Sequence, residues 1–345
     1  MARRTPRRAP QDCGGLVVAS GIMPLVPYNP PFFLFNRHLE TIFPALMRSV
    51  ELPPYTRERI ETPDGDFLDL DWLSRSQQIG RTGDAGMRPL LILSHGLEGD
   101  SQRPYIKGMA KAFLLQGFDV LAWNFRGCGL DMNRLLRFYH SGATEDLDLV
   151  VQHAIQQGYT QIDLVGFSLG GNLTLKYLGE RTLPPAIHRA AVFSVPLDLH
   201  DACLEISRRE NWIYARRFLK SLKSKITRKA AKMQGLDTSR LEHIRTILEF
   251  DEYYTAPLHG FASALDYYKR NSSIHFLDGI HVPTLIVNAV NDPFLGKNSF
   301  PMERLAKHAS VTFECITRGG HVGFAQINKN GLYWSEERAL QFILT

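Results

Sequence analysis

The sequence predicts an α/β fold with a mostly parallel central sheet and helices on both of its faces. Short apolar runs of strand character alternate along the chain with amphipathic segments of roughly 10 to 15 residues. Such alternation implies right-handed crossovers and therefore parallel strands. With 345 residues, 44% of them hydrophobic and 22% charged, the chain can bury a core of this size. We expect one domain over residues 23–345.

The first half of the chain supplies a hairpin followed by strands and helices in turn. Residues 58–74 contain two strand-like runs that turn at Asp64 and Gly65, which predicts an antiparallel pair at the edge of the sheet. The runs "PLLILS" and "DVLAWN" are expected strands, and "YIKGMAKAFLLQGF" between them is an expected helix that ends near Gly117. The segment "TEDLDLVVQHAIQQGY" is a further helix, because acidic residues open it and a glycine closes it.

The second half continues the pattern after a glycine-rich corner. Ile162–Val165 and the run "AAVFSVPLDL" are expected strands, as are Leu285–Val290 and Val311–Ile316, and "SEERALQFIL" is an expected closing helix. The alternation breaks over residues 199–281, which are mostly helical in pattern. An insertion at this place lies above the carboxyl ends of the strands, where open α/β sheets bind ligands. We interpret residues 199–281 as a helical cap.

The charge of the chain is concentrated in two places. The net charge is +5, but residues 1–22 hold four arginines against one aspartate, and the block 208–232 holds ten Lys or Arg against Glu210. Because the positive charge is confined to these two segments, it does not indicate a nucleic-acid-binding surface. Residues 1–22 lack the uninterrupted apolar run of a secretory signal, so we expect a disordered extension, with Met23 as a plausible natural start.

The four cysteines are far apart and form no metal-ligand pattern. We expect free thiols in a cytoplasmic protein, with no disulfide and no structural metal. The glycine-containing loops lack the Lys-Ser/Thr of a P-loop, and no G-x-G-x-x-G lies between a strand and a helix. We therefore expect no nucleotide and no other cofactor.

Ser168 is the candidate nucleophile. The stretch "QIDLVGFSLGGNLTLKYLGE" places this serine between a strand-like run and a helix-like run, with Gly166 and Gly170 two residues away on each side. The pattern G-x-S-x-G is typical of a nucleophile elbow, in which the hydroxyl is held out at the top of a sheet. The same pentapeptide also occurs as a plain glycine-rich turn, so the hypothesis depends on finding partners for the serine.

A serine hydroxyl needs a base, and the base needs a carboxylate that orients it. Asp292 follows one predicted strand in "NAVNDPFL", and His321 follows the next in "TRGGHVGF", after two glycines. The chain order serine, aspartate, histidine is the order expected for a nucleophile elbow on such a sheet. Among the twelve histidines His140 is the main rival, but it precedes a helix and is interpreted as structural.

Acyl transfer also requires donors for an oxyanion. One is expected to be the backbone amide of Leu169, which follows the nucleophile. The other is expected in the loop "HGLEG" after the strand "PLLILS", where we select the amide of Leu97. His95 in this loop is interpreted as a loop-shaping residue.

The chain resembles the α/β-hydrolase superfamily, and more narrowly the YheT-like esterase family, which includes eukaryotic abhydrolase-domain lipases and the plant embryogenesis-associated proteins. The stretches that carry the resemblance lie between Pro30 and Phe324: "PPFFLFNRHLETIFPALMR", "LSHGLEGDSQRPYIKGMAKAF", "NFRGCG", "YHSGATEDL", "GFSLGGNLTLKYLGE", "FDEYYTAPLHGF", "NAVNDPFL" and "GGHVGF". The resemblance implies an α/β-hydrolase fold and a triad of Ser168, Asp292 and His321. In one departure, Asn291 stands where relatives often have a first aspartate, and we assign the acid to Asp292.

These observations predict a monomeric serine hydrolase that cleaves carboxylic esters, including lipid or medium-chain acyl esters, through an acyl-enzyme. Two alternatives remain open. The same triad could transfer the acyl group to an alcohol instead of water, or the scaffold could bind a ligand without catalysis. The natural substrate is not determined, because the shape of the acyl pocket depends on how residues 199–281 fold.

The basic block 208–232 has helical periodicity. Its apolar positions recur every three or four residues: Ala215, Phe218, Leu219, Leu222, Ile226, Ala230 and Met233. Seven cations fill most of the remaining circumference: Arg216, Arg217, Lys220, Lys223, Lys225, Arg228 and Lys229. The simpler interpretation is a cap helix whose charges are solvated. The alternative is peripheral membrane contact, in which this face rests on anionic lipid head groups.

Overall fold

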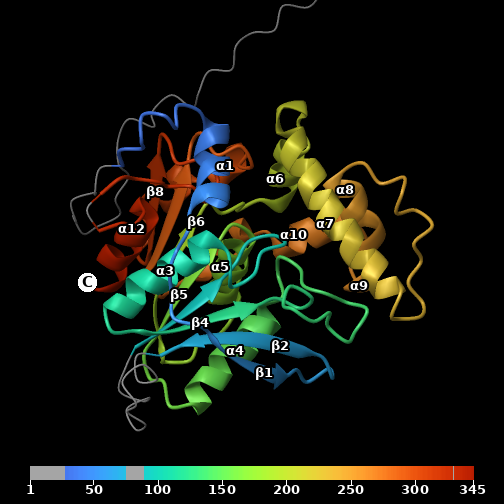
Figure 1. The fold of residues 1–345 in the computed structure, drawn as a ribbon, viewed down its shortest axis with the longest axis horizontal. Helices are drawn as coiled ribbons and strands as arrows, with labels where there is room; N and C mark the ends of the chain where they lie inside the picture. Colours follow the sequence, from blue (N-terminus) through green and yellow to red (C-terminus); the bar gives the residue numbers. More distant parts are fainter. Residues whose placement is uncertain (1–27, 75–88, 329) are drawn as a thin grey trace, which may run out of the picture.

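The computed structural model describes residues 28–74, 89–328 and 330–345. The predicted extension 1–22, and Met23 as a start, lie outside these residues. The described part contains one sheet with helices on both of its faces (Figure 1). None of the described helices combines the length and hydropathy that crossing a bilayer requires.

The sheet has eight strands in the order β1-β2-β4-β3-β5-β6-β7-β8. Their bounds are Thr56–Glu61 (β1), Phe67–Leu73 (β2), Leu90–Ser94 (β3), Asp119–Asn124 (β4), Ile162–Phe167 (β5), Ile187–Phe193 (β6), Thr284–Ala289 (β7) and Val311–Ile316 (β8). The strands β3 to β8 pair in parallel, whereas β1 pairs antiparallel with β2, and β2 with β4. The predicted fold class and the predicted edge hairpin are confirmed.

Helices cover the sheet on both faces. Outside residues 199–281 the described helices are Arg37–Met47 (α1), Pro104–Leu115 (α3), Thr144–Gln156 (α4), Leu169–Glu180 (α5), Lys297–Ser299 (η6), Met302–Leu305 (α11) and Trp334–Ile343 (α12). One apolar core lies between the sheet and α3 with α12, and another between the sheet and α4 with α5. The residues of β3, β4, β5 and β7 are buried throughout, as expected for strands covered on both sides.

The strand predicted over residues 190–199 differs from the observed one. The strand β6 begins earlier, at Ile187, and ends at Phe193. The polar residues His188 and Arg189 near its start interrupt the apolar run by which the strand is recognised in the sequence. The pairing register with β5 also shifts at this point. Ser194 then adopts a φ of 54°, which ends the extended run, so residues 194–198 form a loop.

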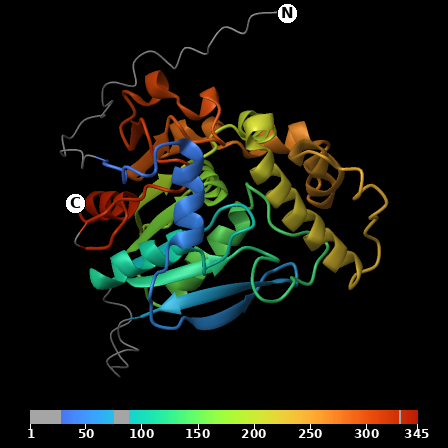
Figure 2. The same cartoon turned by 45° about the horizontal axis from the view of Figure 1, so that its top comes forward.

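Residues 199–281 contribute no strand to the sheet. They form Leu199–Ile206 (α6), Arg209–Asn211 (η2), Trp212–Ala230 (α7), Ile247–Phe250 (α8), Asp251–Thr255 (η3), Ala256–Leu258 (α9), Ala264–Asn271 (α10), Ser273–His275 (η4) and Leu277–Gly279 (η5). The chain leaves the sheet after β6 and returns at β7. Figures 1 and 2 show α6 to α9 grouped at one side of the sheet, and we call residues 199–281 the helical insertion.

Candidate active site

Ser168 lies at the corner between β5 and α5. Its backbone has φ 53° and ψ −118°, a conformation that non-glycine residues rarely adopt. The two flanking glycines permit the close approach of strand and helix. A Cβ at Gly166 would lie 2.6 Å from the Gly170 carbonyl oxygen, and a Cβ at Gly170 would lie 2.4 Å from the carbonyl oxygen of His95. The strand–turn–helix geometry matches that of a nucleophile elbow.

His321 connects Ser168 with Asp292. Its Nε2 lies 2.9 Å from Ser168 Oγ, and its Nδ1 lies 2.8 Å from Asp292 Oδ2. The amide of Phe294 donates to Asp292 Oδ1 over 2.9 Å, which holds the buried carboxylate in place. With the proton on Nδ1, the lone pair of Nε2 faces the serine hydroxyl, as a general base requires. The structure thus brings together the three residues that the sequence selected.

Asn291 makes no hydrogen bond with His321. Its amide Nδ2 donates to Glu40, and its Oδ1 accepts a hydrogen bond from the amide of Gly320 over 3.1 Å. An aspartate at this position would set a second carboxylate against Glu40, whereas asparagine supplies a donor. Asparagine therefore suits the electrostatic surroundings of this position in this chain.

Glu40 is a structural part of the site that the sequence did not reveal. This carboxylate is buried on α1 and accepts hydrogen bonds from Arg318 Nε over 2.7 Å and from the amide of Gly319 over 3.1 Å. Next to it, Thr41 Oγ1 accepts from the amide of His321 over 2.9 Å. Helix α1 thereby holds the loop that carries His321. The segment "NRHLETIF" was part of the resemblance, but one sequence contains no signal that pairs it with residues 318–321.

Two backbone amides are available beside Ser168. In the loop after β3, the amides of Gly96, Glu98 and Gly99 each donate a hydrogen bond, to Tyr105, Tyr139 and Gly96 respectively. The amide of Leu97 has no acceptor among the described residues. The same holds for the amide of Leu169, at the first turn of α5, where amides have no partner within the helix.

The loop that contains Leu97 also lies close to the nucleophile. A Cβ at Gly96 would lie 3.3 Å from Ser168 Cβ, so the backbone of this loop passes beside the serine side chain. Two amide donors next to the serine form an arrangement that can hold an oxyanion.

The other candidate histidines are neutral parts of the framework. The buried ring of His95 lies 2.8 Å from the Gly96 carbonyl through Nδ1, and its Nε2 accepts from the amide of Phe125 over 3.2 Å. Burial lowers the pKa of His95 to about 3. The Nδ1 of His140 accepts from the amide of Gly142, and burial holds the pKa of His140 well below its usual value. Both rings fit the structural roles predicted for them.

No group of three or more His, Cys, Asp or Glu side chains within residues 28–74, 89–328 and 330–345 could hold a metal ion. Cys128, Cys203 and Cys315 carry free thiols. Cys13 lies outside the described residues.

Two cavities meet at Ser168. The inner cavity lies under the helical insertion, and the outer, larger cavity opens beside α1 and α7. Five residues line both of them: Leu97, Ser168, Phe218, Phe294 and His321. A substrate that spans the two cavities would pass its reacting bond beside the serine. This arrangement suits an ester, which has one group on each side of its carbonyl carbon.

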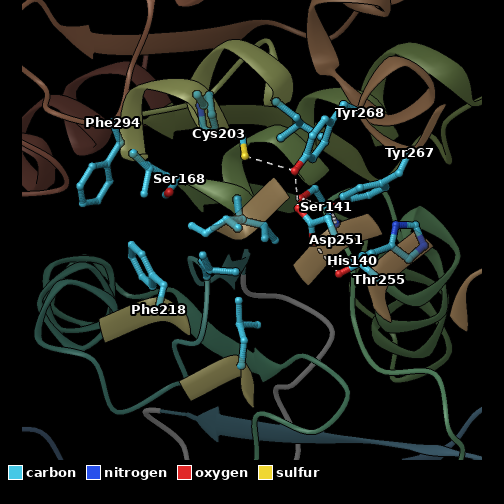
Figure 3. Close-up of a pocket in the computed structure, with 18 of the residues that line it drawn as sticks. His140, Ser141, Ser168, Cys203, Phe218, Asp251, Thr255, Tyr267, Tyr268 and Phe294 are labelled. Carbon is cyan, nitrogen blue, oxygen red and sulfur yellow. Dashed lines mark hydrogen bonds between the residues drawn. The ribbon is translucent and has the colours of Figure 1, made fainter. Parts of the chain in front are cut away.

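The inner cavity is apolar near Ser168 and polar at its far end. Figure 3 shows Phe218 and Phe294 on the side of Ser168, Tyr268 and Asp251 on the opposite side, and Cys203 between the two groups. The carboxyl of Asp251 accepts hydrogen bonds from Thr255 Oγ1 and from the Tyr268 hydroxyl. Burial raises the pKa of Asp251 to about 6. We call Asp251, Thr255 and Tyr268 the polar cluster. It marks the end of the apolar part of the inner cavity and so limits the length of the apolar chain that the cavity can hold.

The charged face predicted for α7 is wrong at two positions. Lys225 and Lys229 are buried, with 2% and 0% of their surface exposed, instead of being solvated. Lys229 Nζ donates to Asn133 Oδ1 over 2.6 Å and to the carbonyl of Leu135. Lys225 Nζ lies 2.6 Å from Glu98 Oε1. Both lysines meet polar groups of the catalytic body, because the loops after β3 and β4 lie under this helix.

Glu98 joins the helical insertion to the loop of Leu97. Its side chain is 9% exposed and its backbone has a φ of 52°, and its carboxylate also accepts from the hydroxyls of Tyr139 and Ser221. Burial raises the pKa of Glu98, but the charge and hydrogen bond of Lys225 more than offset this and keep the pKa below its usual value. A non-glycine residue in the left-handed region is retained only where its surroundings hold it. The Glu98–Lys225 pair therefore orients the backbone next to Leu97.

We expect Glu98→Gln to lower kcat on a soluble ester by about tenfold or more, with a much smaller change in KM. If the Leu97 amide is displaced, the oxyanion loses a hydrogen bond that is made mainly in the transition state. Loss of one oxyanion donor lowers kcat by about 10²- to 10³-fold. Steady-state kinetics with p-nitrophenyl acetate measures the effect. The matched control is Arg228→Gln, which removes an exposed cation from the same helix.

The double variant Glu98→Gln/Lys225→Met separates positioning from stability. Glu98→Gln alone leaves a buried lysine without its carboxylate, which costs about 3–5 kcal/mol of stability. The second change removes that charge, so Tm should recover while kcat stays low. Full recovery of kcat together with Tm would assign the pair a purely structural role.

The sequence matches the family described as the alpha/beta hydrolase fold over residues 89–325. It is 35% identical to the YheT esterase of Escherichia coli (strain K12) over 294 residues, which cover 84% of each chain. It is 28% identical to the phospholipase ABHD3 of Mus musculus over 303 residues, which cover 87% of this chain and 73% of that one.

Among solved structures, the Pyrococcus furiosus esterase Pf2001 superimposes with a TM-score of 0.53 at 16% identity, over 93% of this chain and 97% of that chain. At this level of identity the likeness concerns the fold alone.

Proposed function

The chain belongs to the α/β-hydrolase family and is an ester hydrolase, and from this premise we propose that it is a serine carboxylesterase with Ser168 as nucleophile. The observation that carries the proposal is the position of His321, within 2.9 Å of Ser168 Oγ and 2.8 Å of Asp292 Oδ2. In this proposal His321 is the general base and Asp292 orients it. The amides of Leu97 and Leu169 hold the oxyanion.

The reaction proceeds in two halves. Ser168 Oγ attacks the ester carbonyl carbon as its proton passes to His321 Nε2, and the carbonyl oxygen becomes an oxyanion beside the two amides. When the C–O bond to the alcohol breaks, His321 returns the proton to the leaving oxygen, which leaves an acyl group on Ser168. Water then attacks this acyl group with His321 as base, and the carboxylic acid departs. No cofactor takes part.

The two cavities suggest how an ester is divided. The inner cavity, with its apolar walls near Ser168, suits the acyl chain, and the outer cavity suits the alcohol part. The polar cluster around Asp251 limits the apolar length, which favours medium-chain acyl groups over long ones. A lipid ester also agrees with the name of the related phospholipase.

The test is a hydrolysis profile on p-nitrophenyl acetate, octanoate and palmitate. We expect kcat/KM on octanoate to exceed that on acetate by at least about tenfold, since each buried methylene contributes about 0.8 kcal/mol. A serine-reactive fluorophosphonate should label the protein once and abolish the activity. An equal rate on acetate and octanoate would contradict an acyl role for the inner cavity, and a protein that resists the fluorophosphonate would contradict the nucleophile.

A further inference from the structure

An exposed apolar patch covers α1 and the segment before it. Its members are Phe32, Phe33, Phe35, Phe43, Leu46 and Met47, which we call the α1 patch. Exposed fractions of 91% for Phe32, 74% for Phe35 and 67% for Met47 show that the side chains face outward. The ring of Phe33 lies 5.7 Å from that of Phe32 and 5.2 Å from that of Phe43, so these rings join the segment before α1 to the helix itself. Clusters of this kind mark interaction sites in soluble proteins.

Helix α1 is amphipathic, but its polar side faces the core and its apolar side faces outward. The residues that it buries are Glu40, Thr41 and Pro44, of which the first two hold the loop of His321. The residues that it exposes at helical spacing are Phe43, Leu46 and Met47. A surface helix ordinarily turns its apolar side toward the core. The outward apolar side of α1 therefore does not serve the packing of this domain.

The α1 patch reaches the rim of the outer cavity. Leu46 belongs to both, because it is 65% exposed and also lines that cavity. Other residues of α1, Ile42 and Ala45 among them, continue the cavity wall toward Ser168. An apolar molecule on the patch therefore has a continuous route to the nucleophile.

Cations lie beside the α1 patch. Figures 1 and 2 show α1 (blue) next to the first turns of α7 (yellow). Arg37 pairs over 2.9 Å with Glu210 of η2, which directly precedes α7. Arg209, Arg216, Arg217 and Lys220 are exposed there and have no ion-pair partner within the described part of the chain. The same turns expose Trp212 and Ile213. Aromatic and aliphatic side chains flanked by unpaired cations match the chemistry of an anionic lipid–water interface.

We propose that the α1 patch docks on an anionic lipid surface and that ester molecules pass from this surface through the outer cavity to Ser168. The docking uses the apolar side of α1 together with the exposed cations of residues 209–220, and not the buried Lys225 and Lys229. The delivery of the ester rests on the proposed function, whereas the docking does not.

Co-sedimentation of the full chain with vesicles tests the docking. Vesicles of phosphatidylcholine alone are compared with vesicles that contain an equal part of phosphatidylglycerol, at low and at high salt. We expect binding to the anionic vesicles, weakened by salt. The variant Phe32→Ser/Phe35→Ser/Met47→Gln should lower this binding by about tenfold or more, because it removes the most exposed apolar side chains. Leu130→Ser, which changes a leucine 87% exposed on another loop, is the matched control.

A second variant, Arg209→Gln/Arg216→Gln/Lys220→Gln, should lose the salt-sensitive part of the binding, with a loss of about fivefold per cation at low salt. None of the residues changed in these two variants lines either cavity. Hydrolysis of soluble p-nitrophenyl acetate should therefore stay unchanged in both variants. Inactivity of the wild type on that ester would contradict the proposed function. It would not contradict the docking, which the vesicle experiment tests separately.

Three results would overturn the docking proposal. The first is equal binding of the wild type and the α1 patch variant to anionic vesicles, and the second is no binding of the wild type to either vesicle. The third is a dimer, measured by light scattering, that the α1 patch variant converts to a monomer without loss of vesicle binding. That result would assign the patch to contact between two copies of the chain.

Discussion

Ser168→Ala is expected to lower kcat by about 10³-fold or more on any ester that the wild type cleaves, with no loss of the fold. The Oγ that it removes has one hydrogen-bond contact in the described structure, with His321 Nε2. Alanine also keeps the size that the turn between β5 and α5 accepts. Steady-state kinetics gives kcat, and thermal unfolding followed by circular dichroism should give a Tm close to that of the wild type.

The matched control for this variant is Ser207→Ala, at the end of α6, where the hydroxyl bonds the carbonyl of Cys203. It should keep wild-type kinetics. If Ser168→Ala retains a kcat near that of the wild type, the proposed mechanism is wrong.

Asp292→Asn is expected to lower kcat by about 10²- to 10⁴-fold. The amide cannot compensate the charge of the imidazolium, and it favours the wrong tautomer of His321 because its NH₂ group would face Nδ1. The Phe294 amide that holds Asp292 Oδ1 would still find an oxygen to bond, so the local backbone should be retained. The measurement is kcat on p-nitrophenyl octanoate as a function of pH.

Asn291→Ala is the matched comparison, because this neighbour contacts Glu40 and Gly320 instead of His321. It should cost much less than Asp292→Asn. Equal losses at the two positions would leave the assignment of the acid unsupported, and a larger loss at Asn291 would reverse it.

The order of strands and helices, and the three residues that meet at the site, were predictable from the sequence. Residues that directly follow parallel strands lie at one edge of a sheet, so Ser168, Asp292 and His321 could be brought together without coordinates. Leu97 could be selected because the loop after the first central strand lies at the same edge. These inferences need only local patterns and the geometry of a parallel sheet.

The tertiary structure decided what each surface faces. Periodicity placed Lys225 and Lys229 among the solvated charges of α7, but Glu98 lies 127 residues away in the sequence and Asn133 lies in another loop, and their oxygens pair with both lysines. In the same way, Glu40 points inward because it pairs with Arg318 and with the amide of Gly319 on the loop of His321. Phe43, on the other side of α1, therefore points outward. A helical repeat identifies the residues that share a face. It does not identify the partner of that face, because the partner is set by long-range packing and by the energy of pairing buried charges.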